Sequence, residues 1–284
     1  MRFVVLLQIS LFSFFSLCVG ESKGDDLNRL IVETIKEMPS AGGYARYQRD
    51  LPENQRFLQL YETVDDLQSA IRVGIGGKLK VNAGAAGAPS FCSSATYLLF
   101  CAVLEKLQED GRMPVDRALN QEIADVGATR SVIHGKLDGV GIFGHWNANG
   151  PGTGVLFSRL DLGSNFSSFE RAKPGDFLKI FWNEAIGKGE RGHLVVYLGE
   201  NERGDAIEVW SSNMSNEDGS GGYGSMWVEK DRIKRALFSR FERPKNLLRW
   251  LEFSEKEKTS DYLVAILSKG STGEEMKKVT RSED

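Results

Sequence analysis

Residues 89–100 read Pro-Ser-Phe-Cys-Ser-Ser-Ala-Thr-Tyr-Leu-Leu-Phe, and they place Cys92 at the start of an apolar helix. Ser90 is expected to cap that helix, because a serine hydroxyl accepts a hydrogen bond from a first-turn N–H group that has no helical partner. Cys92 then lies in the first turn, where the helix dipole favours a thiolate over a thiol. The stretch therefore predicts a buried helix that presents a reactive cysteine at its N-terminus.

The apolar pattern continues for several turns after Cys92. Side chains at i, i+3, i+4, i+7 and i+8 predict a helix that is buried over a broad face, and these are Ala95, Leu98, Leu99, Ala102 and Val103. The polar sequence Asp110-Gly111-Arg112 is expected to end the helix.

A second cysteine, Cys101, lies nine residues further along the same predicted helix. At 100° per residue the two side chains point to opposite faces, about 13 Å apart along the axis. A disulfide needs Cα atoms within about 7 Å of each other. We therefore expect Cys92 to remain a free thiol and Cys101 to pack in the core.

A histidine opens a predicted strand much later in the chain. Residues 192–199 read Gly-His-Leu-Val-Val-Tyr-Leu-Gly, which is a short apolar run between glycines. A thiol on a helix and an imidazole on a strand are a combination that cysteine hydrolases use as nucleophile and general base. Cys92 and His193 are therefore the candidate catalytic pair.

Helical periodicity precedes strand periodicity along the chain, which is typical of an α+β fold. Two amphipathic stretches, residues 27–38 and 57–67, predict an N-terminal helical extension over residues 21–80, and the Gly/Ala-rich residues 73–89 read as a loop. Runs at 177–182, 193–198 and 206–211 predict antiparallel strands within a main domain at residues 81–250. Residues 251–284 are expected to be a charged, partly disordered tail, with its last dozen residues disordered.

Two glycine-rich segments are candidates for substrate contacts. Residues 130–154 read as a long loop, and His145, Trp146, Asn147 and Asn149 within it are candidates for lining a substrate groove; the alternative is a tight turn that Asn and Gly favour. Tyr223, in the polar loop 212–225, is a candidate for closing the site, and the alternative is again a plain turn.

The first twenty residues are typical of a signal peptide. Arg2 supplies the positive charge, residues 3–17 are largely apolar, and Cys18-Val19-Gly20 ends in small residues. The apolar run is shorter than the roughly 20 residues that span a bilayer. We expect an exported protein, periplasmic or extracellular, without stable membrane insertion.

Charge and histidine spacing argue against nucleic acid and metal ions as partners. The 284-residue chain has a formal net charge of −3, which argues against nucleic acid as its main partner. Its three histidines, His134, His145 and His193, show no metal-ligand spacing, so no metal and no cofactor is predicted. The sequence does not indicate an oligomeric state.

The order of three motifs resembles a family of cell-wall hydrolases. Cys92-Ser93 is followed by Pro174-Gly175-Asp176-Phe177 and then by the Gly-His strand at residues 192–199. This order, over residues 89–213, is similar to the papain-like NlpC/P60 and CHAP cysteine peptidases and amidases. The resemblance implies a helix carrying the cysteine packed on an antiparallel sheet, and peptidoglycan stem peptides or a related exported amide as substrate.

The third polar residue of the site is expected on the strand after His193. Alternation puts Ser211 and Asn213 on one face of that strand, and CHAP-like members have Glu and Asn at the corresponding positions. Asn213 is favoured to orient His193, as an amide does in papain-like proteases, with Ser211 and Ser212 as alternatives. In the family, Asp often precedes the nucleophile, where this chain has Phe91.

A second function is compatible with the same residues. The lack of an acidic partner for His193 favours a non-catalytic module that binds a glycan or peptide through the loops Trp146–Asn149 and Trp210–Tyr223. Cleavage by wild type but not by a Cys92→Ala variant would distinguish the enzyme from this module.

Overall fold

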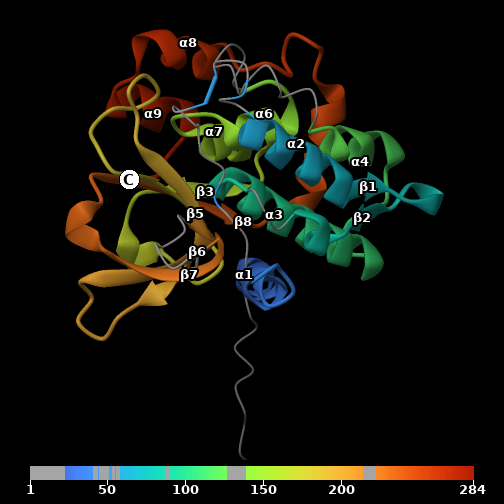
Figure 1. The fold of residues 1–284 in the computed structure, drawn as a ribbon, viewed down its shortest axis with the longest axis horizontal. Coiled ribbons are helices and arrows are strands. Elements are labelled where there is room, and N and C mark those ends of the chain that lie inside the picture. Colours follow the sequence, from blue (N-terminus) through green and yellow to red (C-terminus); the bar gives the residue numbers. More distant parts are fainter. Residues whose placement is uncertain are drawn as a thin grey trace, which may run out of the picture.

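The computed structural model describes residues 23–40, 44, 51–52, 55, 58–86, 90–126, 139–213 and 222–284. The predicted signal peptide and His134 lie outside these ranges. Within them, helices surround one large antiparallel sheet (Figure 1), which confirms the predicted α+β class.

A six-stranded antiparallel sheet forms the centre of the fold. Its strands lie in the order β3-β8-β4-β5-β6-β7, with the bounds β3 (Gly163–Phe166), β4 (Phe177–Phe181), β5 (Gly192–Glu200), β6 (Ala206–Asn213), β7 (Gly222–Glu229) and β8 (Arg235–Phe241). The three predicted strands and their antiparallel pairing are confirmed. β6 and β7 also extend into the segment 212–225, which the sequence predicted as a loop; residues 214–221 lie outside the described ranges.

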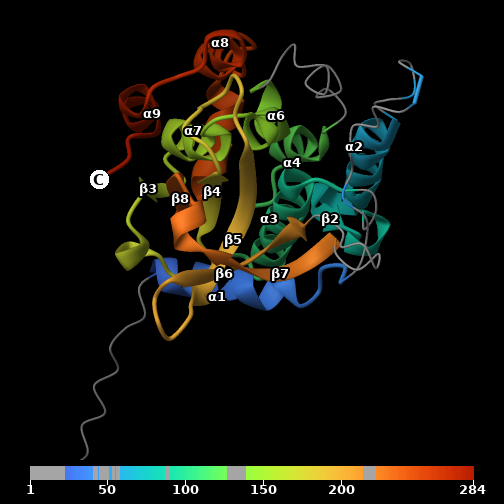
Figure 2. The same ribbon diagram turned by 60° about the vertical axis from the view of Figure 1, so that its left-hand side comes forward.

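Helix α3 (Cys92–Glu109) packs against β5 and β6 of this sheet (Figure 2). Both of its predicted ends are confirmed, but its predicted cap is wrong. The residue before the helix is Phe91, whose N–H donates to Ser94 Oγ at 2.6 Å. The hydroxyl of Ser90 instead pairs with that of Ser212 on β6, because the chain is still extended there and directs this side chain to the sheet.

An aromatic cluster holds α3 against the sheet. The ring of Phe100 lies 4.7 Å from that of Trp146 and 5.2 Å from that of Phe241, and Trp146 lies 5.0 Å from Phe177. All four side chains are almost fully buried, and burying each contributes about 2–3 kcal/mol. Cys101 belongs to the same core, as predicted.

The N-terminal helices share this core. α1 (Lys23–Ile35) packs against α3 and β8, and α2 (Leu58–Ala70) packs against α3. The loop predicted at residues 73–89 is partly wrong, because β1 (Ile71–Val73) and β2 (Leu79–Val81) pair as a hairpin there. The N–H of Leu79 donates to Oε1 of Gln108 at 3.0 Å, which attaches the hairpin to α3.

A long loop was predicted at residues 130–154, but two helices occupy the described part of this segment; residues 130–138 lie outside the described ranges. The two helices are α6 (Gly141–Asn147) and α7 (Gly152–Leu160), and they follow α4 (Arg117–Ala124). Glycine disfavours a helix locally, but burial of Phe143, Trp146 and Leu156 in the core outweighs that preference.

The C-terminal tail is ordered, which corrects the predicted disorder. After the 3-10 helix η7 (Pro244–Glu252), α8 (Asp261–Lys269) and α9 (Gly273–Thr280) pack beside the sheet. Leu263, Ile266 and Met276 are buried, and Thr272 and Glu275 form a capping box. The charged residues that suggested disorder occupy the solvent-facing sides of these short helices. Further 3-10 turns are η2 (Ile75–Gly77), η3 (Ala83–Ala86), η5 (Phe169–Arg171) and η6 (Lys230–Arg232).

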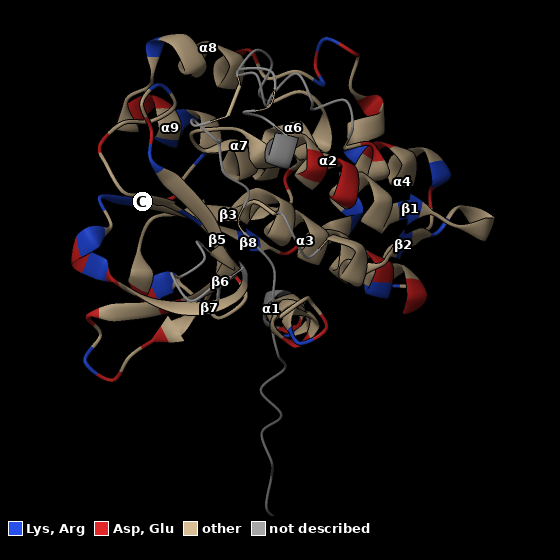
Figure 3. Ribbon diagram, in the orientation of Figure 1, with Lys and Arg blue, Asp and Glu red and all other residues tan. Residues whose placement is uncertain are grey.

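Charges of both signs are interspersed over the described elements (Figure 3). Among the described helices, none combines the length and apolar character that crossing a membrane requires.

Candidate active site

Cys92 and His193 meet where the start of α3 reaches β5. The strand register pairs His193 with Ile180 on β4, and the His193 side chain hydrogen-bonds the sulfur of Cys92. Burial raises the pKa of the thiol, but the His193 hydrogen bond and charge, the N–H of Leu194 and the charge of Lys179 outweigh it and lower the pKa to about 6. The Cys92 sulfur is therefore largely a thiolate at neutral pH.

The pKa of His193 moves in the opposite direction. Burial lowers it, but the hydrogen bond and negative charge of Cys92 and the hydrogen bond to Asn213 together raise it above its ordinary value. A lowered thiol pKa beside a raised imidazole pKa is the signature of a thiolate–imidazolium ion pair.

Asn213 fixes the imidazole. Nε2 of His193 lies 2.9 Å from Oδ1 of Asn213, which leaves Nδ1 for the sulfur. Nδ2 of Asn213 donates to the carbonyl oxygen of Gly224 on β7 at 2.9 Å, so the neighbouring strand holds the carboxamide in this orientation. The Trp182 ring stacks on the imidazole with centroids 6.4 Å apart and an interplanar angle of 29°. The structure thus brings the three predicted catalytic residues together.

The two alternatives to Asn213 have other partners. Ser211 is buried, and its hydroxyl donates to the carbonyl oxygen of Leu194 at 2.8 Å and contacts that of Cys92 at 3.5 Å. Ser212 pairs with Ser90. Both serines join β6 to its neighbours, and neither is the hydrogen-bond partner of the imidazole; Ser211 also does not line the cleft.

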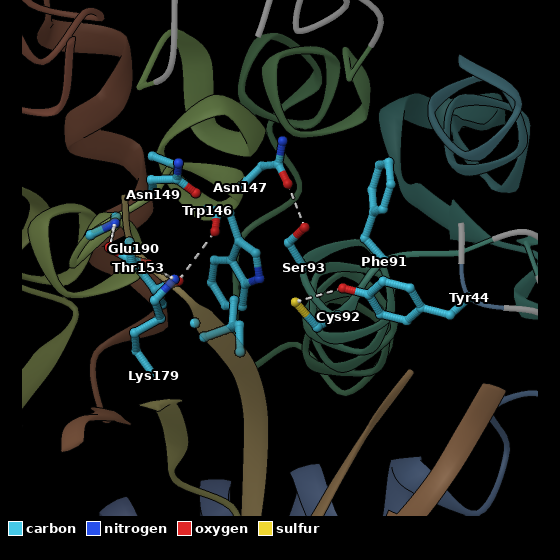
Figure 4. A pocket seen from close by; sticks show the side chains of 15 residues that line it. Tyr44, Phe91, Cys92, Ser93, Trp146, Asn147, Asn149, Thr153, Lys179 and Glu190 are labelled. Carbon is cyan, nitrogen blue, oxygen red and sulfur yellow. Dashed lines mark hydrogen bonds and ion pairs between the residues drawn. The ribbon is translucent and has the colours of Figure 1, made fainter. Parts of the chain in front are cut away.

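A cleft of about 200 Å³ opens beside Cys92 (Figure 4). The start of α3 and the segment from Trp146 to Thr153 line one part of it, and Lys179, Glu190, Gly192 and Leu194 line another. Asn147 and Asn149 lie in this lining, and Oδ1 of Asn147 accepts a hydrogen bond from the Ser93 hydroxyl. The cleft surface is mostly polar.

The prediction that His145 lines the groove is wrong. Its side chain is fully buried on α6, with Nδ1 2.8 Å from the carbonyl oxygen of Gly141 and Nε2 2.7 Å from Nη1 of Arg159. Burial lowers its pKa to about 4. The neighbouring Trp146 does line the cleft, but its indole is buried and donates to Thr96 Oγ1 at 3.0 Å.

Tyr223 does not close the site either. Its side chain is buried, and its hydroxyl donates to the carbonyl oxygen of Ala86 at 2.8 Å. The ring lies beside Trp210, with centroids 5.8 Å apart. Tyr223 therefore fastens the η3 turn to β7, because its position on the strand directs it to the core rather than to the cleft.

Three residues near the sulfur escaped prediction from the sequence. The hydroxyl of Tyr44 donates to Sγ of Cys92 over 3.7 Å, and Lys179 forms an ion pair with Glu190 in the cleft. Of the three, only Lys179 could have been noticed in the sequence, because it is a charged residue in the otherwise apolar run Phe177-Leu178-Lys179-Ile180-Phe181. Tyr44 and Glu190 reach the site from segments with no recognisable motif.

The Pro174-Gly175-Asp176 motif has a structural role. The buried carboxylate of Asp176 accepts hydrogen bonds from Nε and Nη2 of Arg240 at 2.9 and 2.7 Å and from Asn28 Nδ2 at 2.8 Å. Gly175 has φ +99°, and a side chain there would meet the backbone of Asn28. The motif thus secures the start of β4 to α1 and β8.

Cys92 and Cys101 are both free thiols, as predicted. Burial raises the pKa of Cys101 well above its ordinary value, so only Cys92 is activated. Among the described residues, no three His, Cys, Asp or Glu side chains cluster to hold a metal ion.

No family model, no curated protein and no solved structure matches the chain.

Proposed function

We propose that this chain is a cysteine hydrolase that cleaves an amide bond, with Cys92 as nucleophile, His193 as acid and base, and Asn213 as the residue that orients His193. The observation that carries the proposal is the continuous contact from sulfur to imidazole to carboxamide, in which the thiol pKa is lowered to about 6 and the imidazole pKa is raised. A buried structural cysteine shows the reverse, as Cys101 does.

The chemistry follows from these positions. The Cys92 thiolate adds to the amide carbonyl, and the imidazolium of His193 gives its proton to the departing amine, which leaves a thioester. His193 then takes a proton from water, the hydroxide adds to the thioester carbonyl, and collapse releases the carboxylic acid and regenerates the thiolate–imidazolium pair.

The start of α3 supplies an anion-stabilising group. Cys92 is the first helical residue, and the first N–H groups of a helix have no acceptor within it. In the proposed reaction the Cys92 N–H donates to the oxyanion of the tetrahedral intermediate, where such a donor contributes about 3 kcal/mol.

The proposed fold family is papain-like, of the NlpC/P60 or CHAP type. The helix-borne cysteine packed on an antiparallel sheet, the Pro-Gly-Asp turn before β4 and the Gly-His start of β5 support this. We propose an exported enzyme, periplasmic or extracellular, that acts on peptidoglycan stem peptides or a related peptide.

Purified peptidoglycan and its soluble stem peptides test the activity. Wild type, Cys92→Ala and the control Cys101→Ala are incubated with each substrate, and new amino termini and fragment masses are measured. We expect products from wild type and Cys101→Ala but none from Cys92→Ala. If all three proteins sediment with the peptidoglycan and none releases fragments, the protein is the binding module instead.

A further inference from the structure

A buried ion pair lies in the same cleft as the proposed nucleophile. Nζ of Lys179 is 2.7 Å from Oε1 of Glu190, with 14% of the lysine side chain and 1% of the glutamate side chain exposed. Both residues and Cys92 line the cleft, as Figure 4 shows. Most ion pairs among the described residues are far more exposed, for example Arg203–Asp205 at 80% and 55%. Desolvating an ion pair costs free energy, so a buried Lys179–Glu190 pair in the same cleft as the sulfur indicates a role beyond stability.

The fold holds this pair at a fixed position. Oε2 of Glu190 accepts the N–H of Gly150 at 2.5 Å and that of Gly187 at 2.8 Å, so both oxygens of the carboxylate are held, one by the lysine and the other by two backbone amides. Lys179 has little freedom, since only 14% of its side chain is exposed and its ammonium lies 5.5 Å from the ring centroid of Phe181 on the same strand.

Gly192, directly before His193, leaves the space that the pair occupies. A Cβ atom at this position would lie 2.6 Å from Oε1 of Glu190 and 2.8 Å from Nζ of Lys179. The φ of Gly192 is not in the left-handed region, so close approach rather than backbone conformation requires the glycine. The start of β5 therefore accommodates the ion pair and the imidazole side by side.

Within the described ranges, few charged groups act on the sulfur of Cys92. From β5 the His193 imidazole faces it, from β4 the Lys179 ammonium acts on it, and Tyr44 contributes a phenol whose own pKa the negative charge of Cys92 raises. Glu190 is the ion-pair partner that faces Lys179. The lysine charge lowers the pKa of Cys92 and also that of His193, so it favours the thiolate while it opposes the imidazolium.

We propose that Lys179 is a positioning residue that keeps Cys92 ionised through its charge, and that Glu190 anchors Lys179 while offsetting part of that charge. The inference deepens the proposed function and rests on it only in taking Cys92 as the reactive sulfur. If the ion pair were merely structural, losing either partner would disturb the cleft alike and shift the apparent pKa of Cys92 in the same direction.

The pH dependence of Cys92 alkylation by iodoacetamide separates the two roles. The reagent is neutral, so the lysine charge does not steer it, and the rate follows the thiolate fraction. We expect Lys179→Met to raise the apparent pKa of Cys92 by about half a unit to one unit, slowing alkylation about threefold to tenfold below that pKa. Glu190→Gln retains an acceptor for the two amides and should shift the apparent pKa downward.

Two further variants complete the experiment. Lys179→Arg keeps the charge and should retain the wild-type profile. Lys230→Met is the matched control, because Lys230 forms a 2.6 Å ion pair with Glu200 on the same sheet but does not line the cleft. Circular dichroism establishes that each variant is folded.

An unchanged profile in folded Lys179→Met, or shifts of the same sign in Lys179→Met and Glu190→Gln, overturns the inference. If Lys179→Met does not fold, Glu190→Gln decides alone, and an unchanged or raised apparent pKa overturns it. Alkylation needs no substrate, so the opposite shifts can appear in a protein that cleaves no amide; in that case the proposed hydrolysis fails and the electrostatic role of Lys179 stands.

Discussion

His193 and Asn213 are joined through Nε2 and Oδ1 at 2.9 Å, and this contact leaves the other ring nitrogen, Nδ1, for Cys92. The carboxamide is in turn held by the carbonyl oxygen of Gly224 on the adjacent strand. The orientation of the acid–base residue is thus set by the pairing of β6 with β7, at a distance from the helix that carries the nucleophile.

Asn213→Ala should lower kcat/KM for amide cleavage about tenfold to a hundredfold, because the imidazole loses the group that fixes its orientation. Substrate affinity should change little, since Asn213 does not line the cleft. Steady-state kinetics on a fluorogenic peptide or a released stem peptide measure both. Ser211→Ala is the control; a larger loss there than in Asn213→Ala would identify the serine as the orienting residue.

The rate of Cys92 alkylation should fall as the pH is lowered, with a midpoint near pH 6, which is the pKa of the thiol in the folded protein. In His193→Ala the burial of the sulfur is no longer offset by the imidazole, so the pKa rises and alkylation at neutral pH slows roughly a hundredfold. Iodoacetamide labelling followed by peptide mass spectrometry reports each cysteine separately. Equally slow labelling of Cys92 and Cys101 in the wild type contradicts the ion pair.

His145 should make the fold sensitive to acid. Its pKa in the folded state is lowered to about 4, so the fold favours the neutral ring, and stability present above the ordinary histidine pKa is lost as pH falls toward 4. A shift of this size corresponds to about 3 kcal/mol at pH 4. Urea unfolding at several pH values measures the loss, and His145→Gln should reduce its dependence on pH in this range. An undiminished slope in that variant would assign the acid sensitivity to other groups.

Asp176→Ala should destabilise the fold by about 3–5 kcal/mol, because it leaves the largely buried guanidinium of Arg240 without its carboxylate. Asp205→Ala provides the comparison, since its ion pair with Arg203 is well exposed and should cost less than about 1 kcal/mol. Chemical denaturation of both variants gives the two free energies of unfolding. Similar values for the two would show that the Pro-Gly-Asp turn is not a structural anchor.

The sequence predicts the parts of the site that local patterns determine. A helix start identifies Cys92, strand alternation relates Ser211 to Asn213, and the apolar run at 193–198 identifies the strand of His193. These signals depend on residues close together in the chain, and the structure brings the three side chains together as predicted.

The residues that escaped prediction depend on contacts between distant segments. Glu190 lies in the connection before β5 and meets Lys179 on β4 because that connection folds back over the strand, and Tyr44 reaches the sulfur from a position 48 residues before it. His145 was misplaced because its glycine-rich segment suggested a loop, whereas tertiary burial makes it a helix and turns the imidazole inward. The tail was misjudged for the same reason, since a few apolar residues such as Ile266 suffice to dock short, charged helices.

The opposite placement of the two thiols on α3 also governs the response to oxidants. A cysteine that lines the cleft and has a thiol pKa near 6 is oxidised to sulfenic acid more readily than one packed in the core. Cys101 lies across the helix, beyond the reach of a disulfide, so it cannot trap that sulfenic acid and protect it from further oxidation. Recovery after exposure to peroxide therefore depends on a thiol supplied from outside the described chain, and preparations for kinetic work have to be kept reduced.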